Sequence, residues 1–338
     1  MRTPISGVTS IATVGAVTLR FVAHDAGWFE PRHSPGVVGR GRATETGSVA
    51  CMSGPVVVSA RPTLAVRVRR VWAYRELLVG LVRKELKVKY KNSVLGFAWS
   101  MLNPALYLLV FWFVFEKVLR NGVPQFPIFL LSGLLVWNLF SVAVGAATGS
   151  IVDNAGLIKK VAFPREVLPL ASVGAAVVHF FLQLVVLVVA LFGFRSDIAW
   201  SYVPLLPLAL VVVIVLAAGV GVLLSALNVY LRDIKHVVDL LLLAWFWFTP
   251  IVWQFRSLAD PGTAAERLGL LNPITPIVLT FQRALYARLE TESGPILPDW
   301  TVAHHLSLLL VVFALGIVLV VVGEIVFGRL EGDFAEEL

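Results

Sequence analysis

Ionisable or strongly polar side chains inside long apolar stretches are the residues of this sequence that could form an ion or proton path. The candidates are His179, Gln183, Asp239 and Glu324. They stand singly or near the end of a stretch, so no chain of acidic and histidine side chains crosses a whole apolar segment. This arrangement argues against a proton- or sodium-coupled transporter.

Motifs for covalent or nucleotide chemistry are also missing from the sequence. It contains no G-x-x-x-x-G-K-[ST], no H-E-x-x-H, no G-x-S-x-G and no dense carboxylate loop of the kind a membrane glycosyltransferase would use. Cys51 is the single cysteine, which excludes an internal disulfide and argues against a cysteine-based metal cluster. We therefore expect no catalytic residue, no metal site and no cofactor bound by this chain.

The polar stretch from Ser150 to Glu166 lies between two long apolar segments. Asp153 or Asn154 can cap a short helix there, and Pro164 can end or kink it. The helix would keep several apolar side chains: Leu157, Ile158, Val161 and Phe163. Exposed apolar residues bordered by charge are typical of a partner site, but packing against the protein's own cytoplasmic helix explains them equally well.

Aromatic residues cluster within or near the apolar stretches. The clusters are Phe111 to Phe113 with Phe115, Trp137 with Phe140, and Trp245 to Phe248 with Trp253. Tryptophan is ordinarily enriched where a protein meets the membrane surface. A tryptophan cluster inside a short span could instead stack on sugar rings, and the sequence does not show in which direction these side chains point.

The composition of the whole chain indicates an integral membrane protein. Of its 338 residues 58% are hydrophobic and 14% charged, with a mean hydropathy of +0.85, whereas soluble domains carry roughly 25% charged residues. The net charge of +7 comes from one region, since residues 61–91 hold ten Lys or Arg and two Glu. Basic residues are not interleaved with aromatic ones on a polar fold, so we predict no binding of nucleic acid.

Six uncharged windows predict six transmembrane helices, because a bilayer needs about 20 helical residues. The windows are 92–115, 121–152, 167–194, 198–231, 240–255 and 300–323. The fifth is short, and it spans only if His236 and Asp239 lie at one rim and Gln254 and Arg256 at the other. The fold class that follows is an all-α integral membrane protein.

A seventh apolar segment, 268–282, is interrupted by Asn272-Pro273 and Thr275-Pro276. Proline removes a backbone donor and disfavours helix at the residue before it. We therefore expect a re-entrant or interfacial segment that does not cross, with a surface loop as the alternative.

The segment before the first span has apolar residues at helical spacing, such as Leu78, Leu81 and Val82, between many basic ones. This pattern predicts a basic amphipathic helix lying in the membrane interface. The residues expected to contact lipid are Arg75, Arg83, Lys84, Lys87, Lys89, Tyr90 and Lys91. The bias of Lys and Arg predicts that both termini are cytoplasmic.

Residues 1–60 show no periodicity and are expected to be disordered or a mis-annotated extension, with translation beginning at Met52. The predicted domains are therefore this extension, a basic amphipathic interface segment, a six-span transmembrane domain and a cytoplasmic C-terminal tail. Their boundaries are 1–60, 61–91, 92–328 and 329–338.

Four ordered patches carry a resemblance to a known family. They are Lys89–Pro104, Asn154–Glu166, Leu224–Asp233 and Phe334–Leu338. The chain from Glu76 to Leu338 resembles the membrane-spanning permeases of ABC exporters that move polysaccharides and polyol phosphates, such as the teichoic-acid and O-antigen export permeases. The resemblance implies a type-2 ABC exporter permease fold with six spans, an N-terminal interface helix and short extracytoplasmic helices before the last span.

The resemblance also implies partners and site residues. Such permeases are homodimers in the plasma (inner) membrane that carry two copies of a separate ATPase subunit, which binds ATP and Mg. The segment implied to couple to the ATPase contains Asn154, Gly156, Leu157, Ile158, Lys159, Lys160, Phe163, Pro164, Arg165 and Glu166. The aromatic residues implied to line a glycan channel are Phe111, Phe115, Trp137, Phe140, Trp245, Phe246 and Trp247.

The predicted function is the membrane-spanning subunit of an ATP-driven exporter of a polysaccharide or lipid-linked glycan, and not an enzyme. An ABC permease for drugs or small lipids is the first alternative, since it would differ in substrate and not in fold. An integral-membrane glycosyltransferase or a secondary transporter is the second.

Overall fold

The computed structural model describes residues 11–14, 17–20, 64–90, 98–118, 123–258, 262–287, 290–291 and 294–338. The chain divides into two units, Met1–Val58 and Ser59–Leu338. In the first unit the described residues form one antiparallel pair, β1 (Ile11–Val14) and β2 (Val17–Arg20), with Ile11 opposite Arg20. The predicted disorder and the start at Met52 lie largely outside the described residues and stay predictions.

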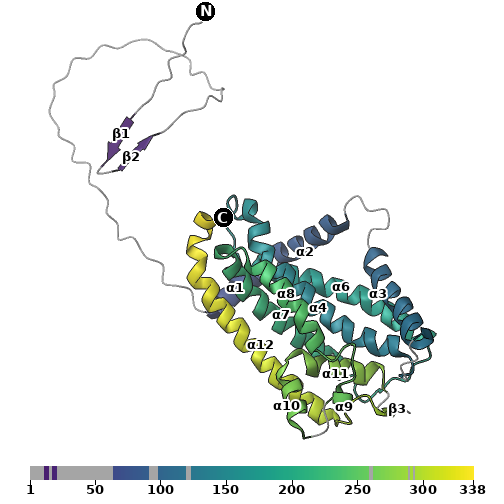
Figure 1. The fold of residues 1–338 in the computed structure, drawn as a ribbon. Coiled ribbons are helices and arrows are strands. Elements are labelled where there is room, and N and C mark those ends of the chain that lie inside the picture. The colour runs from purple at the N-terminus through teal and green to yellow at the C-terminus, as the bar shows by residue number, and fades with distance from the viewer. Residues whose placement is uncertain are drawn as a thin grey trace, which may run out of the picture. The chain divides into compact units, whose positions relative to one another are not determined.

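Long helices dominate the second unit, as predicted. Among the described residues, four helices are long and apolar enough to cross a membrane. They are α4 (Phe126–Asp153), α6 (Val167–Gly193), α7 (Leu205–Tyr230) and α12 (Val302–Leu330). Each falls on one of the predicted windows, and Figure 1 shows them packed side by side as a bundle.

The other two predicted windows contain shorter helices. The window 92–115 contains α3 (Ala98–Phe111), which continues as the π-helical turn η1 (Trp112–Val118). The window 240–255 contains α8 (Ile234–Phe248). His236 and Asp239 lie in the first two turns of α8, and the helix ends before Thr249-Pro250 and so does not reach Gln254. Their predicted place at the membrane rim is not tested. The count of six spans stays a prediction.

Small residues allow the long helices to approach closely. At Gly219 of α7, a Cβ atom would lie 2.7 Å from the backbone nitrogen of Val320 on α12. At Gly221, a Cβ atom would lie 2.7 Å from the Cβ of Ala147 on α4. Glycines at such crossings are the usual device for tight helix packing in membranes.

The predicted break at Asn272-Pro273 is confirmed. Short helices α9 (Phe255–Leu258), α10 (Ala264–Leu271) and α11 (Ile274–Leu285) lie together at one end of the bundle (Figure 1), with strands β3 (Glu290–Thr291) and β4 (Gly294–Pro295). Pro276 does not interrupt α11, because the first turn of a helix needs no backbone donor there. The alternative of a surface loop is wrong for the part that forms α11, since that helix is almost wholly buried.

Both ends of the second unit pack against the long helices. The N-terminal segment forms α1 (Leu64–Ala73) and α2 (Arg75–Tyr90), and α2 packs on α6. At the other end α12 continues to Leu330 and is followed by η2 (Glu331–Asp333) and α13 (Phe334–Glu337), and the predicted domain boundaries stay predictions. The tail is held by Phe334, which is fully buried with its ring 5.3 Å from that of Phe327.

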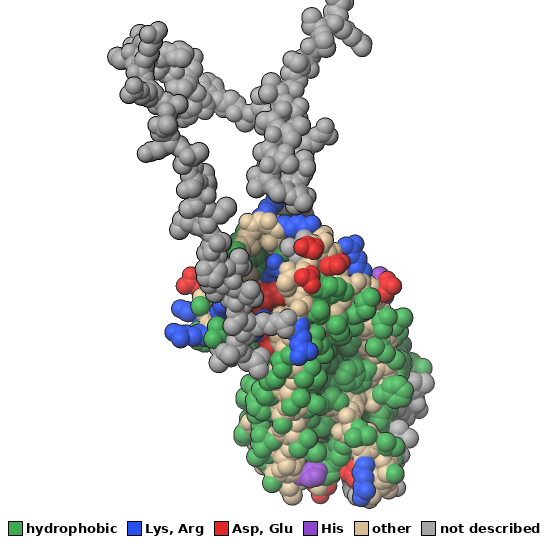
Figure 2. Space-filling model, turned by 90° about the vertical axis from the view of Figure 1, so that its left-hand side faces the viewer, with side chains coloured by type: hydrophobic (Ala, Val, Ile, Leu, Met, Phe, Trp, Pro, Cys, Tyr) green, Lys and Arg blue, Asp and Glu red, His purple; other side chains and the backbone are tan. Residues whose placement is uncertain are grey.

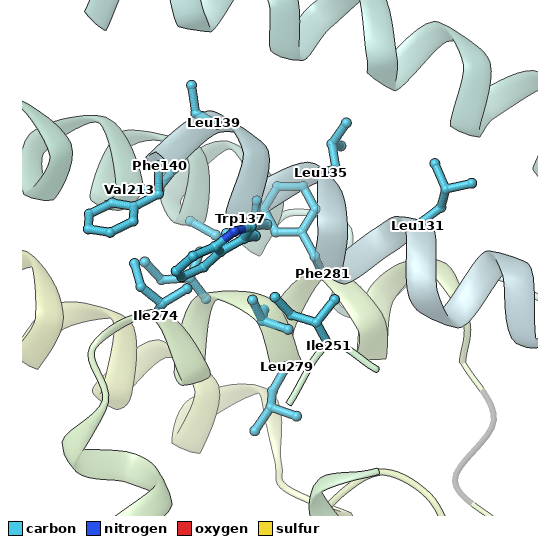
Figure 3. Packing of buried hydrophobic residues seen from close by; sticks show 14 of the residues in the cluster. Leu131, Leu135, Trp137, Leu139, Phe140, Val213, Ile251, Ile274, Leu279 and Phe281 are labelled. Atoms are coloured by element: carbon cyan, nitrogen blue, oxygen red, sulfur yellow. The ribbon is translucent and has the colours of Figure 1, made fainter. Parts of the chain in front are cut away.

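The surface and the core both suit a membrane protein. Figure 2 shows a face on which hydrophobic side chains form a broad band, with most of the charged side chains gathered at one end. Many residues of α12 on the outside are apolar and exposed, such as Val311 and Val318. A band of this kind is what lipid contact requires, and the inside of the bundle is filled by interlocking large side chains (Figure 3).

Candidate functional site

The connection between α4 and α6, residues 154–166, begins with the one-turn helix α5 (Ala155–Ile158). The predicted side-chain cap is wrong, because the Asn154 side chain makes no capping bond. Its Nδ2 donates to the backbone oxygen of Ser150 (2.8 Å), and its Oδ1 accepts from Nζ of Lys84 on α2 (2.7 Å). Pro164 does not end or kink the short helix as predicted, because α5 ends at Ile158 and Pro164 lies just before α6.

This α4–α6 connection has an inner and an outer face. Ile158 is buried and Leu157 and Phe163 are partly buried, in a cluster that includes Leu81 of α2. The outer face is formed by exposed residues: Gly156, Lys159, Lys160, Val161 and Ala162. Packing on the protein itself is confirmed for three of the apolar residues. Val161 is 51% exposed, next to the two lysines and Ala162, and its role in a partner site stays a prediction.

A buried ion network adjoins the α4–α6 connection. Nη1 of Arg67 donates to Oε1 of Glu166 over 2.8 Å, and Oε2 of Glu324 lies 3.8 Å from the same nitrogen. Nη2 of Arg67 lies 3.5 Å from Oε2 of Glu331. The guanidinium is therefore surrounded by three carboxylates from two other parts of the chain, and Arg67 is only 8% exposed.

Sequence reasoning missed Arg67 and Glu331, and it noted Glu324 only as a polar residue near a span end. One signal was present, because Glu324 and Glu331 are seven residues apart and so lie on one face of a helix. No sequence pattern pointed to Arg67 as their partner. A cavity of about 330 Å³ borders the network, lined among others by Arg70, Tyr74 and Phe163.

Helix α2 is amphipathic, as predicted. Leu81 is buried on its inner side, whereas the outer side carries exposed basic residues: Arg75, Arg83, Lys84 and Lys87. Lys89 is exposed as well, but its Nζ lies against α6. Lys91 lies outside the described residues, as does the Tyr90 side chain. The position of α2 in the membrane interface stays a prediction.

Two ionisable side chains of α2 point towards α6. Oε1 of Glu85 accepts from Oγ of Ser172 (2.8 Å), and burial raises the pKa of the Glu85 carboxyl. Nζ of Lys89 lies 3.3 Å from Nε2 of His179, and burial lowers the pKa of Lys89. These contacts fix the rotation of α2 against α6, so that its other basic residues face outward.

The aromatic residues of α4 and α8 meet in one cluster. The ring of Trp137 lies 6.4 Å from that of Trp245 and 5.8 Å from that of Phe246, and Phe140 lies 5.3 Å from Trp245. Trp137 is nearly buried and Phe140 is fully buried, and Figure 3 shows both in the packed core. In this conformation Phe140 is therefore not open to a channel.

The other predicted channel residues occupy different surroundings. Trp247 is 62% exposed. Phe111 and Phe115 are partly buried and belong to a row of rings that runs from Tyr107 to Phe126, with centroids 4.5 to 6.1 Å apart. Their role in a channel stays a prediction.

Two hollows flank α8. One, of about 340 Å³, is lined by Trp137, Ser141, Val142, Asp239, Leu242, Leu243 and Phe246. The other, of about 330 Å³, is apolar and is lined by residues that include Trp245 and Phe248. The carboxylate of Asp239 therefore lies beside aromatic rings at a surface groove.

The polar residues of the apolar stretches do not form a path. His179 contacts Lys89, Gln183 accepts from Nδ2 of Asn138 (3.3 Å), Asp239 lines a hollow and Glu324 lies beside Arg67. Within the described part of the chain, no three His, Cys, Asp or Glu side chains come together so that they could hold a metal ion.

Comparison with known proteins gives a consistent result. Residues 76–286 match the family described as ABC-2 type transporter. The chain is 34% identical over 230 residues to the O-antigen export system permease protein RfbA of Myxococcus xanthus, covering 68% of this chain and 88% of that protein. It is 32% identical over 263 residues to a protein of the same name from Klebsiella pneumoniae, covering 78% and 95%.

A more distant similarity joins the chain to the polysialic acid transport protein KpsM of Escherichia coli. The identity is 25% over 208 residues, covering 59% of this chain and 76% of that protein.

Proposed function

Because the chain belongs to the ABC-2 type transporter family, we propose that it is the membrane-spanning subunit of an ATP-driven exporter of polysaccharide, in the form of a free or lipid-linked glycan. The single observation that carries this proposal is the similarity to O-antigen export permeases over nearly their whole length. The exported class follows from those relatives and from the polysialic acid transport protein.

The ATPase subunit would dock on the outer face of the α4–α6 connection. That face offers two ammonium groups, Lys159 and Lys160, next to the exposed Val161. A basic rim around a small apolar contact suits an acidic groove with an apolar floor on the partner. Two ATPase copies, each with ATP and Mg, would serve a homodimer of this chain.

The glycan would pass along the hollow between α4 and α8. Trp137 and Phe246 offer ring faces, and Asp239 offers a carboxylate that can accept bonds from sugar hydroxyls. Trp247, exposed on α8, would face a second copy or the glycan. Trp245 packs behind this wall, against Trp137 and Phe140, whereas Phe111 and Phe115 would contribute at the row of rings that leads to Phe126.

The proposal includes the placement of the chain in the membrane. The chain would cross the inner membrane six times, with α3 and α8 as the two additional spans and α9 to α11 on the outer side before the last one. Both termini, α2 and the α4–α6 connection would then lie at the cytoplasmic side, where the ATPase works.

Charge reversal at Lys159 and Lys160 tests the docking face. We expect the double variant K159E/K160E to lower glycan export by at least about tenfold, within the range of coupling energies between sites, while the permease remains folded in the membrane. The measurements are surface glycan on cells and ATPase co-purified with the chain. Lys117→Glu, also an exposed lysine but outside the docking face, serves as the control.

Full export by K159E/K160E with normal recovery of the ATPase would contradict the docking face. Activity of the purified chain without any ATPase subunit would contradict the proposed function itself, and would favour a glycosyltransferase or a secondary transporter. Export of drugs or small lipids by an intact complex that moves no glycan would favour the first alternative.

A further inference from the structure

The ion network around Arg67 joins three parts of the chain that are far apart in sequence. Arg67 belongs to α1, Glu166 ends the α4–α6 connection, and Glu324 and Glu331 belong to the end of α12 and the turn after it. Glu166 is 3% exposed and Glu324 is 7% exposed. An ion pair at the surface contributes little to stability, whereas a buried one holds a defined geometry. We therefore expect the three parts of the chain to move together.

The helix α12 is shaped to admit the guanidinium. Gly328 lies between Glu324 of α12 and Glu331 of the following turn, and a Cβ atom there would fall 2.2 Å from Nη2 of Arg67. Any side chain at this position would therefore displace the guanidinium. The glycine is required for space and not for backbone conformation.

A second set of contacts joins the same two parts of the chain. The guanidinium of Arg165 donates to the backbone oxygen of Glu331 and lies 5.7 Å above the ring of Phe334. The hydroxyl of Tyr230 on α7 donates to the backbone oxygen of Leu330 (2.9 Å). The end of α12 is thus joined to the α4–α6 connection directly by Arg165 and, through Arg67, by its neighbour Glu166.

Glu324 provides a second acceptor close to Arg67. Oε2 of Glu324 is buried and accepts no hydrogen bond from the described residues, yet it lies only 3.8 Å from Nη1 of Arg67. The adjoining cavity of about 330 Å³ leaves room beside Arg67 on the side of α1. If Glu166 moves a short distance, the Arg67 side chain can therefore move with it and keep its own charge paired with a carboxylate.

We propose that Arg67 is a positioning residue for transport, which makes the C-terminal end of α12 follow the α4–α6 connection when the ATPase moves that connection. The inference rests on the proposed function, since it requires an ATPase docked at the connection. Arg67 touches neither ATP nor the glycan in this scheme. It transmits displacement from the docking face to the last long helix.

The test uses the full chain in complex with its ATPase subunit, reconstituted in lipid vesicles. Arg67→Gln is compared with Arg69→Gln, a change on the same helix at an exposed arginine. We expect R67Q to assemble and to hydrolyse ATP at the basal rate, but to export about tenfold less glycan per ATP, within the range of measured coupling energies. R69Q is expected to match the unaltered complex.

A second variant separates positioning from stability. Gly328→Ala keeps every charge but occupies the place of the guanidinium, and Gly332→Ala is its control, because a Cβ there meets nothing within 4 Å. We expect G328A to lose coupling as R67Q does, and G332A to keep it.

A distance measurement tests the same idea with Arg67 in place. After Cys51→Ser, the one native cysteine is gone, and spin labels are placed by Asp153→Cys, at the end of α4 next to the connection, and by Glu336→Cys. Both sites are exposed and lie outside the docking face. Labelled chains are diluted with unlabelled ones, so that the distance within one chain is measured. We expect the same distance with and without ATP, and a distance that depends on ATP in R67Q.

The outcomes are distinguishable. An active complex in which R67Q exports as much per ATP as R69Q, or in which the label distance of the otherwise unaltered chain changes with ATP, would overturn this inference alone. A chain that neither binds the ATPase subunit nor exports glycan would overturn the proposed function and this inference with it.

Discussion

The contact between α7 and α12 at Gly219 predicts a large effect for a single methyl group. In Gly219→Ala the new Cβ atom would lie 2.7 Å from the backbone nitrogen of Val320 and 2.9 Å from the Cβ of Leu319, whereas ordinary contacts begin at 3.4 Å. These atoms belong to the backbone or are bonded to it, so they cannot swing aside. The two helices would have to separate locally by about 0.7 Å.

The energetic cost follows from that separation. A gap of about 0.5 to 1 Å forfeits a quarter to a half of the dispersion energy of the atoms that face it, and overpacking typically costs about 1–3 kcal/mol. Alanine returns up to about 1 kcal/mol through its higher helix propensity. A glycine-to-alanine change at an open helical site gains the same propensity, so relative to such a control the cost of about 1–3 kcal/mol remains. With about 2–4 °C of Tm per kcal/mol for domains of about 150–250 residues, we expect Tm to lie about 2–12 °C below that of the control.

The assay is thermal unfolding of the purified chain in detergent, followed by the fluorescence of its ten tryptophans. Gly193→Ala at the end of α6 is the matched control, because a Cβ atom there meets nothing within 4 Å. We expect Tm of this control to stay constant or to rise slightly. If G219A melts together with G193A, the tight contact between α7 and α12 does not exist and the argument from close helix packing is refuted.

Two further predictions concern polar contacts. Burial raises the pKa of the Glu85 carboxyl in the folded protein above its value in the unfolded chain. The neutral carboxyl therefore stabilises the folded state at low pH, and this contribution to the free energy of unfolding is lost as pH rises through the folded pKa. We therefore expect the Tm of Glu85→Gln to be higher than that of the unaltered chain at about pH 8 and equal to it at about pH 4. Equal Tm values at both pH values would contradict the burial of this carboxyl. Asn272→Ala should cost about 1–3 kcal/mol of unfolding free energy, because Oδ1 of Asn272 accepts from Nε1 of Trp245 (2.9 Å) and from the backbone nitrogen of Ile274 (3.0 Å). Nδ2 of Asn272 also donates to Oγ1 of Thr249 (2.9 Å), so alanine removes both a donor and an acceptor; an unfolding free energy of N272A equal to that of the unaltered chain would count against this assignment.

Much of the architecture could be predicted because it depends on local composition. Charge-free windows located α4, α6, α7 and α12, since a helix in lipid must satisfy its own backbone and cover it with apolar side chains. The break before Ile274 followed from Asn272-Pro273 for a similarly local reason. Within the window 240–255 the helix boundaries differ from the charge-free limits: α8 begins at Ile234 and ends at Phe248, because Thr249 before Pro250 is extended.

The sequence by itself determined that this is a membrane protein with an amphipathic N-terminal helix and a basic connection that suits a partner, because hydropathy and periodicity are local quantities. Only the tertiary structure decided which charges meet: Arg67 is separated from Glu166 by 99 residues and from Glu331 by 264. It also decided that Phe140 faces the core and that Phe334 anchors the C-terminus. The direction of a side chain depends on the helix packed against it, and no periodicity within one helix specifies its neighbour.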